Sequence, residues 1–145
     1  MKLTAQDLQI GDWVVYNGDV EYCYPIKVEG MDIATDSLIT TDRDDVGFDG
    51  VWPIPITPEI LEKNGFEKIL DEDNTECYRY YNSAADGYIK ITLYDGLDGD
   101  WGIGIENYEK SDGNHIVYRN DLIFLNVHQL QQAMRLCKIR KEIEL

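Results

Sequence analysis

Histidines, cysteines and carboxylates are the side chains of this sequence that could act as bases, nucleophiles or metal ligands. His128 follows Asn126, a residue typical of helix starts, and its imidazole could serve as a general base or bind a metal. The only other histidine is His115, and glutamines stand three and four positions after His128. A lone histidine at a helix start usually donates to the preceding loop or sheet. We therefore favour a structural role for His128 and predict no catalytic residue and no enzyme.

The cysteines Cys23, Cys77 and Cys137 are far apart and form no CxxC pair. An odd, scattered set favours reduced thiols over a disulfide framework or a zinc site. All three fall in segments with strand or helix patterns, where burial would make the thiols inert. We expect slow reaction of each cysteine in the folded protein.

The acidic loops deserve comparison with calcium-binding loops. Asp42, Asp44 and Gly47 match the first, third and sixth positions of an EF-hand, but Val46 and Pro53 occupy positions that need oxygen ligands. The sequence therefore predicts no metal centre and no cofactor. Weak binding of a cation by loop carboxylates stays open.

Aromatic residues on neighbouring predicted strands form the one candidate binding surface. They are Tyr78, Tyr80, Tyr88, Tyr94 and Trp101. Gly102 and Gly104 would open a shallow trough beside these rings, suited to a sugar, a peptide or a basic side chain. The alternative is that sheets favour tyrosine and that the glycines accommodate neighbouring rings.

An antiparallel meander followed by a helix must position these rings. Strict alternation in residues 88–94 places Tyr88, Lys90, Thr92 and Tyr94 on one face. The strands expected in this half are 77–81, 88–94, 101–105, 115–118 and 122–125. Asn126 and Gln129 have capping-box spacing, which predicts a closing helix over residues 127–141.

The first half of the chain predicts a small, strongly bent β unit of the SH3-like kind. Asn17-Gly18 is a strong hairpin signal between strands at 12–16 and 19–24. Further short strands are expected at 26–28, 37–40 and 50–52, around an acidic loop at 41–49.

A proline-rich connector joins the two halves. Pro53 and Pro55 remove backbone donors and favour extended chain. Thr57 can cap a short helix that Asn64-Gly65 ends, with Phe66 as the apolar residue beyond it. The fold class is therefore α+β, with a lobe at 1–52, a connector at 53–68, and a sheet with helix at 69–145. The two lobes could share one core.

Charge limits the partners. The formal net charge is −15 over 145 residues, with 43% hydrophobic residues typical of a folded protein. Phosphate backbones and anionic lipids reward lysine and arginine, so direct nucleic-acid or membrane binding is not expected. No apolar stretch approaches membrane-spanning length. We expect a cytoplasmic protein whose partner is another protein, and one version of this hypothesis gives that partner a basic surface.

Three segments resemble a known family. In this order, Leu8–Val14, Pro53–Glu67 and Val127–Gln131 are similar to segments of short proteins found in gut-bacterial genomes, their phages and other mobile elements. The similarity spans nearly the whole chain, although residues 132–145 are longer and more basic than the acidic tail usual in the family. The resemblance implies an accessory protein of a mobile element and assigns no catalytic residue.

The function expected from the sequence is a non-enzymatic, acidic interaction protein of a phage or mobile element. A sharper version is a nucleic-acid mimic, whose carboxylates imitate phosphates to occupy a DNA-binding protein. The alternative is a small-ligand, carbohydrate or peptide-binding module that uses the aromatic trough.

Overall fold

The computed structural model describes residues 2–17, 23–32, 34–41, 43, 45–96, 100–123 and 125–145. It contains two five-stranded antiparallel sheets and two α-helices, α1 and α2, so the broad α+β expectation holds. The chain divides into two compact units. The first comprises Met1–Pro55 with Asn126–Gln132, and the second comprises Ile56–Leu125 with Ala133–Leu145. Neither described helix is long and apolar enough to cross a lipid bilayer.

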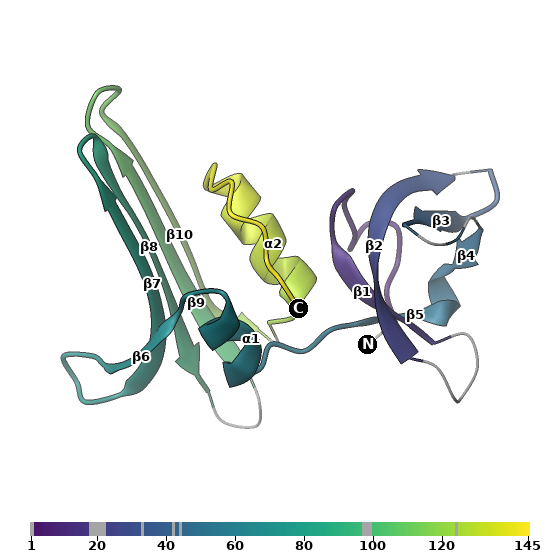
Figure 1. The fold of residues 1–145 in the computed structure, drawn as a ribbon, viewed down its shortest axis with the longest axis horizontal. Coiled ribbons are helices and arrows are strands. Elements are labelled where there is room, and N and C mark those ends of the chain that lie inside the picture. Colours follow the sequence, from purple (N-terminus) through teal and green to yellow (C-terminus); the bar gives the residue numbers. More distant parts are fainter. Residues whose placement is uncertain are drawn as a thin grey trace. The chain divides into compact units, whose positions relative to one another are not determined.

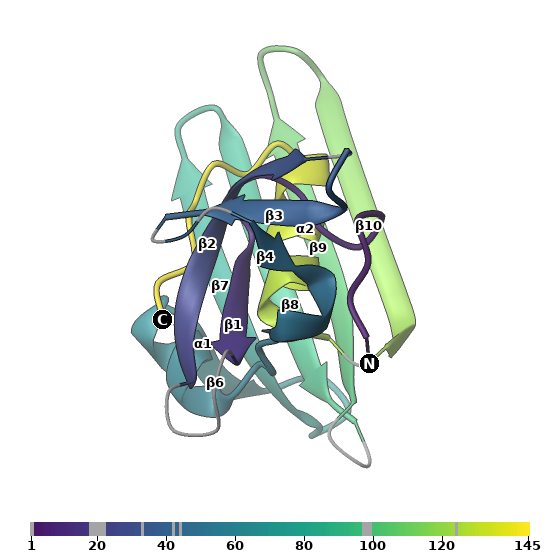
Figure 2. The same ribbon diagram turned by 90° about the vertical axis from the view of Figure 1, so that its right-hand side faces the viewer.

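The first unit is a sheet with the strand order β4-β3-β2-β1-β5, in which every strand except the ten-residue β2 is short. Its strands are β1 (Trp13–Asn17), β2 (Cys23–Asp32), β3 (Ser37–Thr40), β4 (Val46–Gly47) and β5 (Val51–Pro53). A 3-10 turn, Phe48–Gly50, precedes β5. The register of β2 on β3 shifts between Val28 and Gly30, and Figure 2 shows β3 running across the direction of β1. The expected turn after Asn17 lies outside the described residues, whereas β4 falls within the expected acidic loop.

Glutamine side chains from helix α2 (Val127–Leu136) fix the segment before β1. The Gln131 amide accepts a hydrogen bond from the Trp13 N–H at 3.0 Å and donates to the Gly11 carbonyl at 3.2 Å. Gln132 donates to the Asp12 carboxylate at 2.6 Å. Two of the distinctive sequence segments, 8–14 and 127–131, are therefore joined by hydrogen bonds within the first unit.

The second unit is a meander in the order β10-β9-β8-β7-β6 (Figure 1). Its strands are β6 (Glu67–Leu70), β7 (Glu76–Ala84), β8 (Gly87–Asp95), β9 (Trp101–Glu109) and β10 (Asn114–Ile123). Strands β7, β8 and β9 are each longer than the matching prediction, and β10 takes in the strand expected at 115–118 and the first part of the one expected at 122–125. Strand β6 was not expected, because it lies in the connector and in the residues just after it. Residues 97–99, between β8 and β9, lie outside the described residues.

Helix α1 (Pro58–Lys63) has the ends that the sequence predicts. The Thr57 hydroxyl accepts from the Ile60 N–H at 3.4 Å, and Gly65 has a φ of 82°. The Phe66 N–H donates to the Leu61 carbonyl at 3.0 Å, which is the longer bond of a Schellman motif. Because Phe66 is 2% exposed, the apolar residue beyond the cap is also in the core.

Helix α2 is shorter than expected. It begins after Asn126, whose N–H donates to the Gln129 side chain at 2.8 Å as predicted, but it ends at Leu136 rather than near residue 141. Lys138 has a φ of 59°, and the Ile139 N–H donates to the Met134 carbonyl at 2.8 Å. The helix ends in this turn, and the side chain of Ile139, just beyond it, is buried.

We predict that Phe66→Ala lowers the free energy of unfolding by about 3–5 kcal/mol, because it empties a buried aromatic site. Urea unfolding measures this change. The control Glu62→Ala alters an exposed position of α1 and should change stability by less than about 0.5 kcal/mol. Equal effects of the two substitutions would contradict the assignment of Phe66 to the core.

Candidate functional site

Alternation along β9 gives the second sheet two different faces. Trp101, Ile103 and Ile105 are buried on one face, which we call the inner face. Gly102 and Gly104 lie on the opposite face, which we call the outer face, and they place no side chain there. The outer face is therefore open along the middle of β9.

A hollow of about 290 Å³ lies over this part of the outer face. A Cβ built on Gly104 would meet no atom within 4 Å, so the space above Gly104 is empty. We call it the Gly104 hollow. The side chains around it are mostly polar or charged: Lys90, Thr92, Tyr94, Glu106, Val117 and Arg119.

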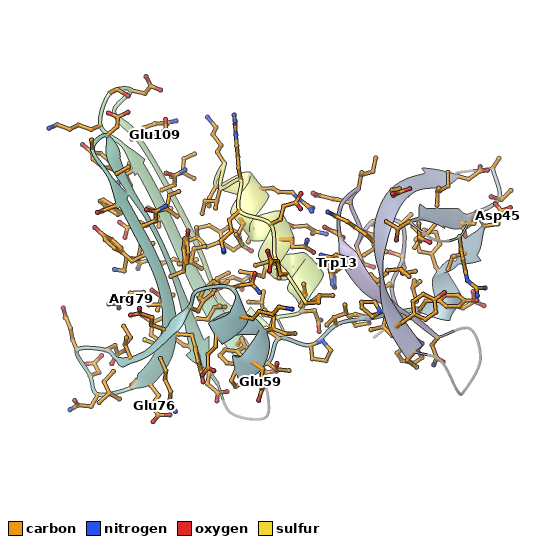
Figure 3. The ribbon with its side chains drawn as sticks, viewed as in Figure 1. Trp13, Asp45, Glu59, Glu76, Arg79 and Glu109 are labelled. Carbon is orange, nitrogen blue, oxygen red and sulfur yellow. The ribbon has the colours of Figure 1, made fainter. Side chains whose placement is uncertain are left out.

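Basic residues gather on the outer face around the hollow. On β7, Arg79 lies opposite Thr92, and Thr92 lies opposite Gly104. Gly104 lies opposite Arg119, while Lys90 precedes Thr92 by two residues on the same face. Figure 3 shows Arg79 between the acidic ends of the sheet that Glu76 and Glu109 mark. Within the described part of the chain, these three basic side chains form no ion pair, and Nε of Arg79 is buried without a hydrogen-bond partner.

A row of rings crosses four strands of the outer face beside the hollow. Ring centroids are 6.0 Å apart for Tyr81 and Tyr88, 5.6 Å for Tyr88 and Tyr108, and 5.8 Å for Tyr108 and His115. Oε1 of Glu106 accepts from the Tyr88 hydroxyl at 3.3 Å and lies 3.0 Å from Nε2 of His115. The row therefore holds the Glu106 carboxylate in place. Desolvation, followed by the nearby Glu106 charge, raises the pKa of Tyr88, so its phenol is a donor at neutral pH.

The five aromatic residues predicted to line one trough lie on two faces. Tyr94 lines the hollow, and Tyr88 belongs to the outer row. Tyr78 and Trp101 are buried on the inner face with ring centroids 5.9 Å apart, and Tyr80 lies on that face with its ring 5.7 Å from Phe66. The prediction combined residues at even and odd positions of neighbouring strands. The pairing register of the strands decides which of these positions lie on the same face of the sheet.

Three charged residues of the hollow were not predicted as site residues. Lys90 shares its face with Tyr88 and Tyr94 by simple alternation, so the sequence carried a signal for it. Glu106 follows Gly104 by two residues on β9, so alternation also placed it on this face, whereas Arg119 comes next to Gly104 only through the pairing of β9 with β10. That register depends on turns whose lengths the sequence pattern did not define.

His128 has the surroundings of a structural residue. Its side chain is 1% exposed, and its Nδ1 atom has no hydrogen-bond partner. Burial lowers the pKa of His128, whereas the charges of Asp12 and Asp7 act in the opposite direction. The imidazole is therefore held neutral in the folded chain. It belongs to the first unit, whereas the residues of the hollow belong to the second.

The three thiols are not equally accessible. Burial raises the pKa of Cys77 and of Cys137, and both side chains are fully buried. Cys23, at the start of β2, is exposed. The expected burial of Cys23 is therefore wrong, because the residue falls at the strand end beyond the core positions Ile26 and Val28.

Acidic loops provide no assembled metal site in the described part of the chain, where no group of three or more His, Cys, Asp or Glu side chains could hold an ion. Asp42 and Asp44, two of the residues compared with an EF-hand, lie outside the described residues.

We predict that a thiol reagent modifies Cys23 rapidly in the folded protein, because only an exposed thiol is accessible to the reagent. Titration at neutral pH should show one fast thiol per chain, followed by two that react only on unfolding. The variant Cys23→Ser should lose the fast phase. Fast modification that persists in this variant would contradict the buried placement of Cys77 or Cys137.

We also predict a pH dependence from His128. Its folded pKa lies below the ordinary value of 6.5, so its contribution to stability is complete above that value and is lost as the pH falls from there toward the lower folded pKa. Urea unfolding between about pH 7 and about pH 5 measures the loss. His128→Gln, which does not titrate, should show a smaller loss over this range. Identical losses would contradict burial of a neutral imidazole.

Comparison of the chain with protein-family models, curated proteins and solved structures gives no match.

Proposed function

We propose that this chain is a non-enzymatic binding protein and that its second unit takes a ligand on the outer face, in the Gly104 hollow. The observation that carries the proposal is an empty space on one face of the sheet, surrounded by hydrogen-bonding groups and by basic side chains that form no ion pair within the described part of the chain. Side chains on strands with a packed opposite face are held more precisely than side chains on loops.

Packing of the sheet does not require a glycine at position 104, and this supports the proposal. Glycine weakens a strand, because it loses more backbone entropy on folding and provides no side chain to pack. No neighbour would clash with a Cβ at Gly104, so the fold has no steric need for glycine there. The glycine keeps the hollow open, and ligand binding accounts for its cost.

The non-enzymatic part of the proposal rests on where the reactive groups lie. Cys77 and Cys137 are buried, and His128 is buried in the other unit. The groups around the hollow are ammonium, guanidinium, hydroxyl, aromatic and carboxylate side chains, and the carboxylate, that of Glu106, is held by Tyr88 and His115.

The remaining expectations from the sequence belong to the same proposal. A cytoplasmic accessory protein of a phage or mobile element is supported by the three segments that resemble such a family and by the scattered cysteines. An SH3-like first unit is supported by its five antiparallel strands, the pairing of β5 with β1, and the 3-10 turn before β5.

A second candidate is an acidic surface for a basic protein partner, including the role of a nucleic-acid mimic. The net charge of −15 favours it. Unlike the first candidate function, binding of a basic partner does not require the hollow. A stoichiometric basic partner that still binds after the hollow is filled would favour this candidate over the first.

Filling the hollow tests the first candidate. We predict that Gly104→Leu abolishes binding to any immobilised carbohydrate or peptide of an array to which the wild-type chain binds, because the new side chain occupies the site. Gly104→Ala should weaken binding less, since it fills less space. Thermal midpoints of both variants should equal or exceed that of the wild type, because both residues replace a strand glycine without a clash.

A matched control places leucine elsewhere on the same sheet. Ser83→Leu changes an exposed β7 position outside the hollow and should leave binding unchanged. Equal binding by Gly104→Leu and the wild type, with both folded, would exclude the hollow as the ligand site.

A further inference from the structure

We propose that the ligand of the Gly104 hollow is a carboxylate-bearing sugar, such as a hexuronic acid residue. This inference rests on the proposed function and adds the chemical class of the ligand. It depends on the charge, spacing and hydrogen-bonding capacity of the residues around Gly104.

The charge of the hollow is opposite in sign to that of the whole chain. Among the described residues that line the hollow, Lys90 and Arg119 are basic, and Glu106, which lies directly opposite Lys90, is acidic. The Glu106 carboxylate is already engaged by Tyr88 and His115. Neither lining cation has an ion-pair partner among the described residues. An anionic group of a ligand would supply the missing partner.

The spacing of the two cations suits one carboxylate. Arg119 lies directly opposite Gly104, and Lys90 lies diagonally from it. In antiparallel sheets, direct neighbours have Cβ atoms about 5 Å apart, and diagonal neighbours are about 7–8 Å apart. Both long side chains can therefore reach a group seated above Gly104. Arginine binds a carboxylate through two parallel hydrogen bonds, and lysine adds a point charge.

Arg79 extends the positive potential beyond the lining residues. It lies opposite Thr92, on the strand that follows in the sheet order. Its other neighbour, Glu67 on β6, is exposed and forms no ion pair with it among the described contacts. Arg79 therefore strengthens attraction of an anion toward the hollow without being its direct ligand.

The Glu106 carboxylate favours a ligand whose anionic group carries a low charge. A phosphate monoester carries nearly two negative charges at neutral pH and would be repelled more strongly by Glu106 than a carboxylate. The charged lining residues Lys90, Arg119 and Glu106 have a formal charge of +1 together, which one ligand carboxylate neutralises, whereas a phosphate dianion would leave an excess of negative charge. The lining thus favours a carboxylate over a phosphate.

The remaining lining groups favour a sugar over an acidic peptide side chain. Thr92 offers a hydroxyl, Glu106 offers acceptor oxygens, and Tyr94 offers an aromatic wall. Sugar hydroxyls can use these polar groups, and the apolar side of a sugar ring can lie against Tyr94. A volume of about 290 Å³ is at the small end of ligand sites and accommodates one such ring.

Isothermal titration of the full chain with methyl β-D-glucuronide tests the inference. A ligand of this size is expected to bind with a Kd of about 1 mM at low ionic strength. The neutral methyl β-D-glucoside, which has a hydroxymethyl group in place of the carboxylate, should bind at least tenfold more weakly. Glucose 6-phosphate and N-acetyl-glutamate amide serve as the phosphate and peptide comparisons.

Charge variants locate the effect. Lys90→Gln and Arg119→Gln should each weaken glucuronide binding about tenfold, as expected for loss of a charge-assisted hydrogen bond. Glu106→Gln should tighten binding, because it removes the opposing charge. Lys110→Gln removes an exposed cation outside the hollow and should change nothing. Amide spectra of every variant establish that the fold is retained.

Each alternative outcome has a definite meaning. Equal binding of the glucoside, or tighter binding of the phosphate or the glutamate amide, would overturn the choice of a carboxylate sugar. If Gly104→Leu still abolished that binding, the proposed function would stand. Absence of saturable glucuronide binding at tens of millimolar would also overturn the inference. The proposed function would then depend on the array result with Gly104→Leu.

Discussion

Burial of alternate residues of β9 is the constraint on which the second unit depends. Trp101, Ile103 and Ile105 can all reach the core only if β9 keeps its present register, since a slip of one residue would turn all three to the outer face. The same register turns Gly102 and Gly104 outward. It also sets Lys90, Glu106 and Arg119 around the space that Gly104 leaves, as their pairing across β8, β9 and β10 requires. The core and the hollow are thus two results of one alternation.

The first unit depends on a comparable constraint made of hydrogen bonds. The side chains of Gln131 and Gln132 bind the chain just before and at the start of β1, where the Asp12 carboxylate is fully buried. The Asp12 carboxylate accepts hydrogen bonds from the Gln132 amide and the Gln9 N–H, and it needs such donors because a buried carboxylate without partners is costly. The resemblance noted in the sequence therefore includes segments that stabilise the fold, and their distinctiveness does not by itself indicate a ligand site.

Local patterns were predictable from the sequence, and arrangements that need pairing were not. The ends of α1 follow from Thr57 and Gly65, which act within a few residues. The end of α2 depends on burial of Ile139 and is decided by tertiary packing. Alternation correctly grouped Tyr88, Lys90, Thr92 and Tyr94, but the candidate trough also took in Tyr78, Tyr80 and Trp101 of the inner face. Arg119 became a candidate only when the register of β10 was known.

We propose that a ligand binds on the outer face of the second sheet, above Gly104. Mapping of backbone amide shifts during titration of the isotope-labelled full chain with methyl β-D-glucuronide tests it most directly. The account predicts that saturable shifts are confined to β8, β9 and β10 around Thr92, Gly104 and Val117. Shifts centred on the first unit, or shifts that do not saturate, would contradict it.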